Sequence, residues 1–283
     1  MFGEGWRRGR QALGIVVQDW RRVLRFGLLP SLLAMLVQLV MPVTVEGGFN
    51  WARWPLVLAL LAVLLWLSAG QQIRWYRWAV LGDDSPAWWS IPLDARPLRF
   101  IGWSLAVGAA LALVGVAVAL AVFLVLLVIK LAGLPEQSVA AVALPLLALA
   151  YMGMKLTPVL VSVAIDRPVR MEAVLRAMGW RRVLVLVLAM LVGVLPLAIV
   201  VALLGGIVGA VAALLSATDK VLGLVGLLDM VAGPFLLAAL GIVVGRFYAD
   251  HLAPVLDGVP ESRGPTDPGP GGPDAGGPSP WSR

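Results

Sequence analysis

The sequence predicts an all-α membrane protein built as a bundle of six transmembrane helices, and its composition and the spacing of its apolar residues support that prediction. Of its 283 residues, 60% are hydrophobic and only 13% are charged, whereas about a quarter of the residues of a soluble domain are charged. The apolar residues gather in six runs of about 20 residues or more, enough to cross a hydrocarbon core of ~30 Å. The runs lack the alternation of barrel strands, and backbone in lipid must satisfy its own hydrogen bonds, so helices are expected.

The N-terminal arm, residues 1–25, is predicted to be an amphipathic helix that lies on the membrane surface. Its apolar side chains recur at helical spacing on one face, and polar side chains occupy the opposite face. The apolar face holds Trp6, Leu13, Val16, Val17 and Trp20, and the polar face holds Arg8, Gln11 and Gln18.

The membrane domain is predicted over residues 26–257. Its six spans are Phe26–Val45, Pro55–Ile73, Phe100–Ile129, Val139–Ile165, Val183–Ser216 and Val221–Gly245. The third and fifth runs would reach roughly 45 and 50 Å as straight helices, longer than a tilted crossing. The fifth run is therefore expected to bend, with Pro196 and the pair Gly205-Gly206 as its natural break points.

The basic residues predict the orientation of the spans. All but three of the 22 Lys and Arg residues lie in the N-terminal arm, the loop after the second span, the connection between the fourth and fifth spans, or the C-terminal region. The exceptions, Arg53, Lys130 and Lys220, are spread one to each of the other loops. Because cytoplasmic loops carry an excess of Lys and Arg, both termini are expected in the cytoplasm. Orientation explains the net charge of +6, so we reject nucleic-acid binding.

Short basic segments open the first, third and fifth spans, at residues 21–26, 95–100 and 181–186. The simplest interpretation is a bundle of three helical hairpins, each entered through a basic cytoplasmic elbow. The alternative is that any entry into the membrane from the cytoplasm favours Arg beside Leu and Phe.

The connection between the fourth and fifth spans is predicted to be such an elbow. Asp166-Arg167-Pro168 ends the fourth span, and Pro168 suits the first turn of a new helix. Over residues 169–180 the apolar side chains again recur at spacings of three and four, which predicts an amphipathic helix at the membrane interface. Arg181 and Arg182 then stand at headgroup level, before the next apolar run.

Chemistry-bearing motifs are absent from the sequence. It has no cysteine and one histidine, and it contains no nucleophile elbow, no zinc motif and no phosphate-binding loop. We therefore expect neither an enzyme nor a cofactor. Polar residues within or beside spans are the best pointers to function, because they are costly in hydrocarbon. The candidate contacts for a ligand or lipid are Lys155, Thr157, Gln71, Gln72, Arg74, Arg181 and Arg182.

Lys155 is the deepest of these candidates. It lies eleven residues before Asp166, which is about 16 Å along a helix. One interpretation is that its side chain extends towards the surface and has no ligand. The other is a wet cytoplasmic cavity, where Thr157 supplies a hydroxyl and the lysine meets an anionic headgroup or substrate.

Two further segments bear on partners and boundaries. Gly205, Gly209 and Ala213 form a ladder of small residues that lets another helix approach closely, either within the bundle or from a membrane-protein partner or a second copy of the chain. Residues 258–283 are rich in Gly and Pro and nearly free of aliphatic residues, so they are predicted to be a disordered cytoplasmic tail.

Two segments carry a resemblance to known proteins: residues 75–84, WYRWAVLGDD, and the sequence AIDRP at 164–168 followed by AVLR at 173–176. They resemble the YciC-like bacterial inner-membrane proteins and the membrane domain attached to some glycerophosphoryl diester phosphodiesterases. The resemblance implies a six-span helical protein of the bacterial inner membrane, associated with envelope lipids.

We expect a non-enzymatic protein that binds or moves lipid or another amphiphile. The alternatives are a structural or accessory subunit of a larger membrane complex and, less favoured, a small-solute transporter.

Overall fold

The computed structural model describes residues 2–40, 54–83, 94–131, 138–214 and 218–256, except for most side chains near the helix ends at 38–40, 125–131, 138–145, 208–214 and 218–231. This part of the chain is all helical. The helices are α1 Phe2–Gln18, α2 Trp20–Val40, α3 Trp54–Leu81, α4 Arg96–Leu131, α5 Ser138–Ala164, α6 Met171–Ala177, α7 Trp180–Gly193, α8 Leu195–Leu214, α9 Thr218–His251 and α10 Ala253–Leu256. The predicted tail, residues 258–283, lies outside the described residues.

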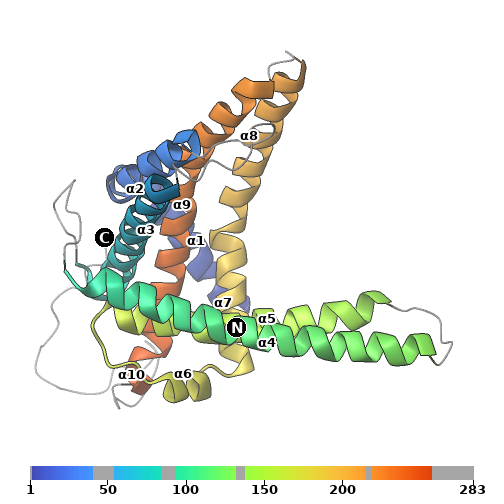
Figure 1. Cartoon of the computed structure of the whole chain (residues 1–283). Coiled ribbons are helices and arrows are strands. Elements are labelled where there is room, and N and C mark those ends of the chain that lie inside the picture. The colour runs from blue at the N-terminus through green and yellow to red at the C-terminus, as the bar shows by residue number, and fades with distance from the viewer. Residues whose placement is uncertain (1, 41–53, 84–93, 132–137, 215–217, 257–283) are drawn as a thin grey trace, which may run out of the picture.

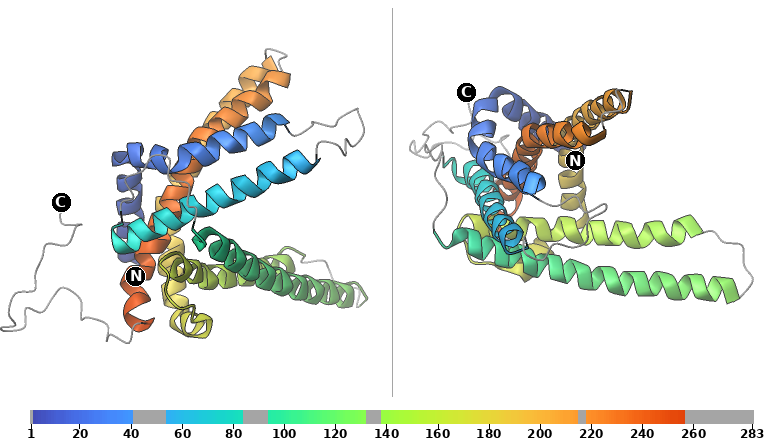
Figure 2. Two further views of the ribbon diagram at one scale, coloured as in Figure 1. Left: turned by 60° about the vertical axis from the view of Figure 1, so that its left-hand side comes forward. Right: turned by 45° about the horizontal axis from the view of Figure 1, so that its top comes forward.

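The long helices pack in pairs that extend in different directions from one end of the molecule (Figures 1 and 2). Helix α2 contacts α3, α4 contacts α5, and α8 contacts α9. Near the common end lie α1, α6, α7 and the C-terminal half of α9. The α4–α5 pair stands farthest from the rest: in its most apolar window only 6% of α4 is buried inside the molecule.

The C-terminal half of α9 is the centre of the core. Helix α9 contacts α1, α2, α3, α5 and α7, and seven side chains of its C-terminal half are almost completely buried: Ala238, Ala239, Ile242, Val243, Val244, Phe247 and Tyr248. Small residues allow these close approaches. A Cβ on Gly241 would lie 2.6 Å from Cβ of Trp75, and one on Gly245 would lie 2.6 Å from Cβ of Ala79. Helix α3 therefore packs on α9 through glycine.

Five helical segments of the described chain are long and apolar enough to cross a membrane: residues 54–81, 96–124, 146–164, 180–207 and 232–251. These segments correspond to the second to sixth predicted spans. Helix α2, which corresponds to the first, is not among them. The predicted end of that span, residues 41–45, lies outside the described residues.

The fifth predicted run is divided into two helices beside one of its expected break points. Helix α7 ends at Gly193 and α8 begins at Leu195, so Pro196 falls in the first turn of α8, where its missing N–H is not needed. The helix then continues through the second expected break point, Gly205-Gly206. Gly205 is half-buried, and the side chains of Gly209 and Ala213 are not among those described.

Helix α1 packs against the protein through small residues. A Cβ on Gly5 would lie 2.8 Å from Cβ of Leu188, and one on Gly9 would lie 2.5 Å from Cβ of Val192. The order of these contacts shows that α1 runs parallel to α7. Ala12 and Val16 continue the buried face. Val16 was predicted to touch the membrane, but it is buried in the protein, whereas Trp6 and Val17 of the same predicted stripe are 57% and 59% exposed.

The predicted elbow after α5 is built on Asp166. This residue has a φ of 59°, the left-handed conformation that usually belongs to glycine after a helix. The backbone N–H of Asp166 donates to the carbonyl of Val163 at 3.2 Å, and that of Arg167 donates to the carbonyl of Ser162 at 2.9 Å. These two bonds form a Schellman motif that ends α5. The following helix, α6, is shorter than the predicted 169–180 segment. It begins at Met171, so Pro168 does not lie in its first turn as predicted, and the chain turns at Met178 and Gly179 before α7.

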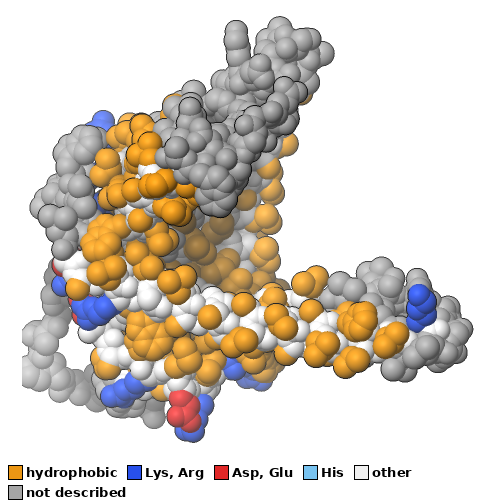
Figure 3. Space-filling model, in the orientation of Figure 1, with side chains coloured by type: hydrophobic (Ala, Val, Ile, Leu, Met, Phe, Trp, Pro, Cys, Tyr) orange, Lys and Arg blue, Asp and Glu red, His pale blue; other side chains and the backbone are white. Residues whose placement is uncertain are grey.

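Three arginines hold the Asp166 carboxylate. Arg77 of α3 lies 3.2 Å from it, Arg96 of α4 lies 2.8 Å away and Arg99 of α4 lies 3.0 Å away. Arg77 also pairs with Asp83, at 2.8 Å. This cluster ties the ends of α3, α4 and α5 together. In the face shown in Figure 3, most visible charged side chains gather towards this end of the molecule, whereas hydrophobic side chains cover the helices that extend from it.

Candidate ligand-binding cleft

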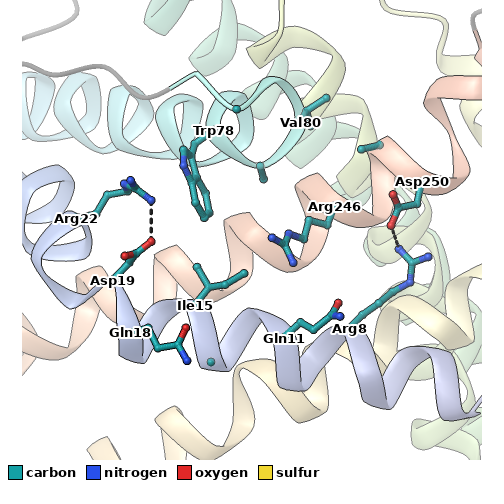
Figure 4. Close-up of a pocket in the computed structure, with 14 residues that line it drawn as sticks. Arg8, Gln11, Ile15, Gln18, Asp19, Arg22, Trp78, Val80, Arg246 and Asp250 are labelled. Carbon is teal, nitrogen blue, oxygen red and sulfur yellow. Dashed lines mark hydrogen bonds and ion pairs between the residues drawn. The ribbon is translucent and has the colours of Figure 1, made fainter. Parts of the chain in front are cut away.

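A polar cleft of about 880 Å³ lies between α1 and α3, with α9 between them (Figure 4). Helix α1 lines the cleft with a different face from the one that packs on α7. Gly5 and Gly9 face α7, while Gln11, Ile15 and Gln18 recur on the cleft side at spacings of four and three. The remaining lining side chains are charged, aromatic or small. They are Arg8, Gly14, Asp19, Arg22, Trp78, Ala79, Val80, Gly82, Arg246, Ala249 and Asp250.

The charges of the cleft are arranged as ion pairs with a positive surplus. Arg22 lies 2.8 Å from Asp19, and its guanidinium stacks over the ring of Trp78 at 5.0 Å from the centroid. Arg8 pairs with Asp250, across 242 residues of sequence. Arg246 of α9 is the third arginine of the lining. Three arginines against two aspartates leave the lining with a net positive charge, which favours an anionic ligand.

The ion network around Arg8 fastens α1 to the end of α9. Arg8 also binds Glu4, one turn earlier in α1, at 2.8 Å. Nε2 of His251 lies 3.2 Å from the same Glu4 carboxylate, and the His251 ring packs against Phe247 with centroids 4.8 Å apart. Burial raises the pKa of Glu4, but the hydrogen bond and the charge of Arg8 outweigh it, so the net pKa is lower than usual. Glu4 is therefore ionised at neutral pH.

An apolar groove of about 710 Å³ lies between α2 and α3, farther along both helices. Its lining contains no charged side chain: it consists of Leu29, Leu32, Leu33, Leu36, Ala62, Val63, Trp66 and Leu67. Hydrocarbon is the ligand that such a surface accommodates, because no lining side chain needs a hydrogen-bond partner except the indole of Trp66.

No protein-family model matches the sequence, and neither a curated protein nor a solved structure gives a significant match. The functional argument therefore rests on the geometry of the cleft and the groove.

Two of the sequence-predicted site residues lie on α3 between these two cavities. The Arg74 guanidinium is over the ring of Phe26, 5.7 Å from its centroid. Gln71 is buried, only 3% exposed, where α2 and α9 meet α3. Gln72, their neighbour, is half-buried on a different face of the helix.

The other predicted site residues have separate surroundings. Lys155 Nζ lies 5.5 Å from the centroid of the Tyr151 ring, one turn earlier in α5. The Thr157 hydroxyl donates to the carbonyl of Gly153 at 2.8 Å, so its hydrogen goes to its own helix. Arg181 is exposed beside Trp180, and Arg182 donates to the carbonyl of Ala177 at 2.9 Å. None of these four lines the cleft or the groove.

Sequence reasoning did not identify most of the cleft. The sequence did contain one sign of the cleft: Arg8, Gln11 and Gln18 have a helical spacing that places them on the polar face of α1. That face was expected to meet water. The residues of α9 that line the cleft with them, Arg246 and Asp250, lie more than 200 residues later, and no local pattern connects them to α1.

Proposed function

We propose that this protein binds an anionic amphiphile of the membrane, with its headgroup in the cleft and its hydrocarbon chain in the groove, and does not transform it chemically. One observation carries the proposal: the same two helices line both cavities. On α2, Arg22 lines the cleft and Leu29 the groove; on α3, Trp78 lines the cleft and Leu67 the groove.

The helical repeat supports a continuous path between the cavities. Seven residues separate the cleft and groove positions on α2 and eleven separate those on α3. At 3.6 residues per turn, each separation brings the side chain back to within about 20° of the same face. The corresponding rise is about 10 to 16 Å, a distance that a lipid with its headgroup in one cavity can bridge with its chain.

Arg74 lies on α3 between the residues that line the groove and those that line the cleft. It is four residues from Trp78 and seven from Leu67, so all three share one stripe of α3. Arginine binds phosphate and carboxylate groups with two parallel hydrogen bonds. A guanidinium at the border between a polar cleft and an apolar groove suits the charged group of an amphiphile, and Arg74 is therefore the proposed headgroup contact.

The proposal includes the topology expected from the sequence: six spans arranged as three hairpins, in a bacterial inner membrane, with both termini in the cytoplasm. The packing of α2 with α3, α4 with α5 and α8 with α9 supports the hairpins. The arginine-rich end of the molecule supports the orientation, because Lys and Arg favour the cytoplasmic side. The cleft would then open towards the headgroups of the inner leaflet.

The test is native mass spectrometry of the protein released from mild detergent, after reconstitution with phosphatidylglycerol or phosphatidylcholine. Leu36→Trp should fill the groove and lower lipid retention. Leu105→Trp places the same side chain on α4, where Leu105 is also exposed, and should leave retention unchanged. Arg74→Gln should remove the preference for the anionic lipid, whereas Arg176→Gln, on exposed α6, should not. Equal retention by all four variants would refute the proposal.

A role as an accessory subunit is the second candidate, and the slight burial of α4 favours it. A stoichiometric protein partner after gentle solubilisation, lost on substitution of apolar α4 residues but retained in Leu36→Trp, would support this role.

A further inference from the structure

The cleft is larger than a phosphate group alone requires. Its volume of about 880 Å³ lies in the range of pockets that enclose a whole drug-sized ligand. In the proposed function, the charged group of the amphiphile lies at the border of the cleft, against Arg74. The space beyond that border then holds the remainder of the headgroup, and the side chains that line this space indicate the chemistry of that remainder.

Two glutamines give α1 a row of uncharged hydrogen-bonding groups along the cleft. Gln11 and Gln18 both line it and are both exposed. Seven residues separate them, so they share one face of the helix, about 10 Å apart along its axis. In Figure 4, no dashed line joins either amide to another of the side chains drawn. Each amide offers N–H donors and a carbonyl acceptor, a combination that suits hydroxyl groups, because a hydroxyl both donates and accepts.

The carboxylates of the cleft are already paired with arginines. Asp19 lies 2.8 Å from Arg22, and Asp250 binds Arg8. An ammonium group in the cleft would therefore compete with a guanidinium for either carboxylate. A hydroxyl would not, because an ionised carboxylate has about four acceptor sites and can keep its arginine while it binds a hydroxyl. The lining thus favours a headgroup rich in hydroxyls over one that carries an ammonium group.

We propose that the headgroup of the bound amphiphile is a polyol of the size of a sugar ring, such as inositol, joined to the lipid through a phosphodiester. This inference rests on the proposed function, because it concerns the ligand of the same cleft. Three arginines and two aspartates line the cleft, and the surplus of one positive charge matches the single negative charge of a phosphodiester. Gln18 is next to Asp19, and Gln11 is three residues from Arg8, so an amide that can bind a hydroxyl lies near each ion pair.

The test compares lipids of equal charge and matched acyl chains in native mass spectrometry of the full chain. Phosphatidylinositol and phosphatidylglycerol each carry one phosphodiester charge, but inositol has more hydroxyls than glycerol. The wild-type protein should retain phosphatidylinositol at least about threefold more than phosphatidylglycerol, since one added hydrogen bond changes binding by about that factor. Gln11→Leu and Gln18→Leu should each lower this ratio, and the double variant should abolish the preference.

The matched control is Gln72→Leu, the same substitution at a half-buried residue of α3 that lines neither the cleft nor the groove. It should leave the ratio unchanged. Thermal unfolding checks that the variants remain folded, and the two single variants carry the same decision if the double variant does not.

The possible outcomes separate this inference from the proposed function. Equal retention of the two anionic lipids, both above phosphatidylcholine, would overturn the polyol headgroup and leave the proposed function standing. A preference for phosphatidylinositol that persists without both glutamines would also overturn the inference, because the polyol would then be bound elsewhere. Equal retention of all three lipids would refute the proposed function, and this inference with it.

Discussion

The packing of α1 on α7 predicts opposite effects for the same substitution at two glycines of one helix. Alanine normally stabilises a helix interior by about 0.5 to 1 kcal/mol relative to glycine. At Gly14 a Cβ would meet no atom within 4 Å, so Gly14→Ala should show this gain. At Gly9 the Cβ would lie 2.7 Å from the carbonyl oxygen of Ala189, a backbone atom that cannot move without moving α7.

The magnitude follows from the difference between the two sites. The gain in helix propensity is the same in both variants, so the difference between their free energies of unfolding gives the cost of packing a Cβ against α7. Forcing extra volume into a packed contact costs about 1 to 3 kcal/mol. We expect the melting temperature of Gly9→Ala in detergent to be several degrees below that of Gly14→Ala, measured by circular dichroism. Equal melting temperatures would show that α1 is not docked on α7 and would refute the packing of this helix.

Three other predictions test separate parts of the protein. Asp166→Ala should lower the free energy of unfolding by about 1 to 2 kcal/mol, because alanine is strained in the left-handed conformation and cannot bind the arginines. Asp166→Gly loses the same arginine contacts without the strain, so it should be less harmful by about 1 kcal/mol. Equal melting temperatures of the two variants would contradict the role of the positive φ. The chain has no native cysteine, so single cysteines can test the topology with an impermeant thiol reagent. Glu172→Cys should react only from the cytoplasmic side and Asn50→Cys only from the outer side. External labelling at position 172 would exclude six spans. Lys155→Met should leave lipid retention unchanged and raise stability, because the lysine lines neither cavity; loss of retention that Lys155→Arg partly restores would place a ligand at this position.

Sequence reasoning predicted the features of this fold that depend on local chemistry. Long apolar runs predicted helices, the Asp166-Arg167-Pro168 segment predicted the end of α5, and Pro196 marked the division of the fifth run. Each of these depends on residues within one or two helical turns. The same reasoning could not predict that Asp166 is held by arginines from α3 and α4, because that contact depends on how the helices are assembled.

The candidate cleft shows the same limit. Arg8 was assigned to the polar face of α1, which is correct, but its partner Asp250 is 242 residues away. Gly5 and Gly9 have the spacing that allows two helices to approach closely, but the apolar residues of the same helix predicted contact with the membrane, and the glycines were not used. Amphipathic spacing identifies which residues share a face, and it does not identify what that face meets.

The parallel contact between α1 and α7 also has a consequence for biosynthesis. Helix α1 is made before α7, which begins 162 residues after α1 ends. At synthesis rates of about 5 to 20 residues per second, α1 waits roughly 8 to 32 s for the surface on which it packs. During that interval its glycine face lacks α7. Its exposed apolar side chains, Phe2, Trp6 and Val17, lie beside basic residues, a combination that favours binding to a membrane surface. A bilayer can therefore hold α1 until α7 is inserted, so that the amphipathic pattern of α1 serves assembly first and the finished protein afterwards.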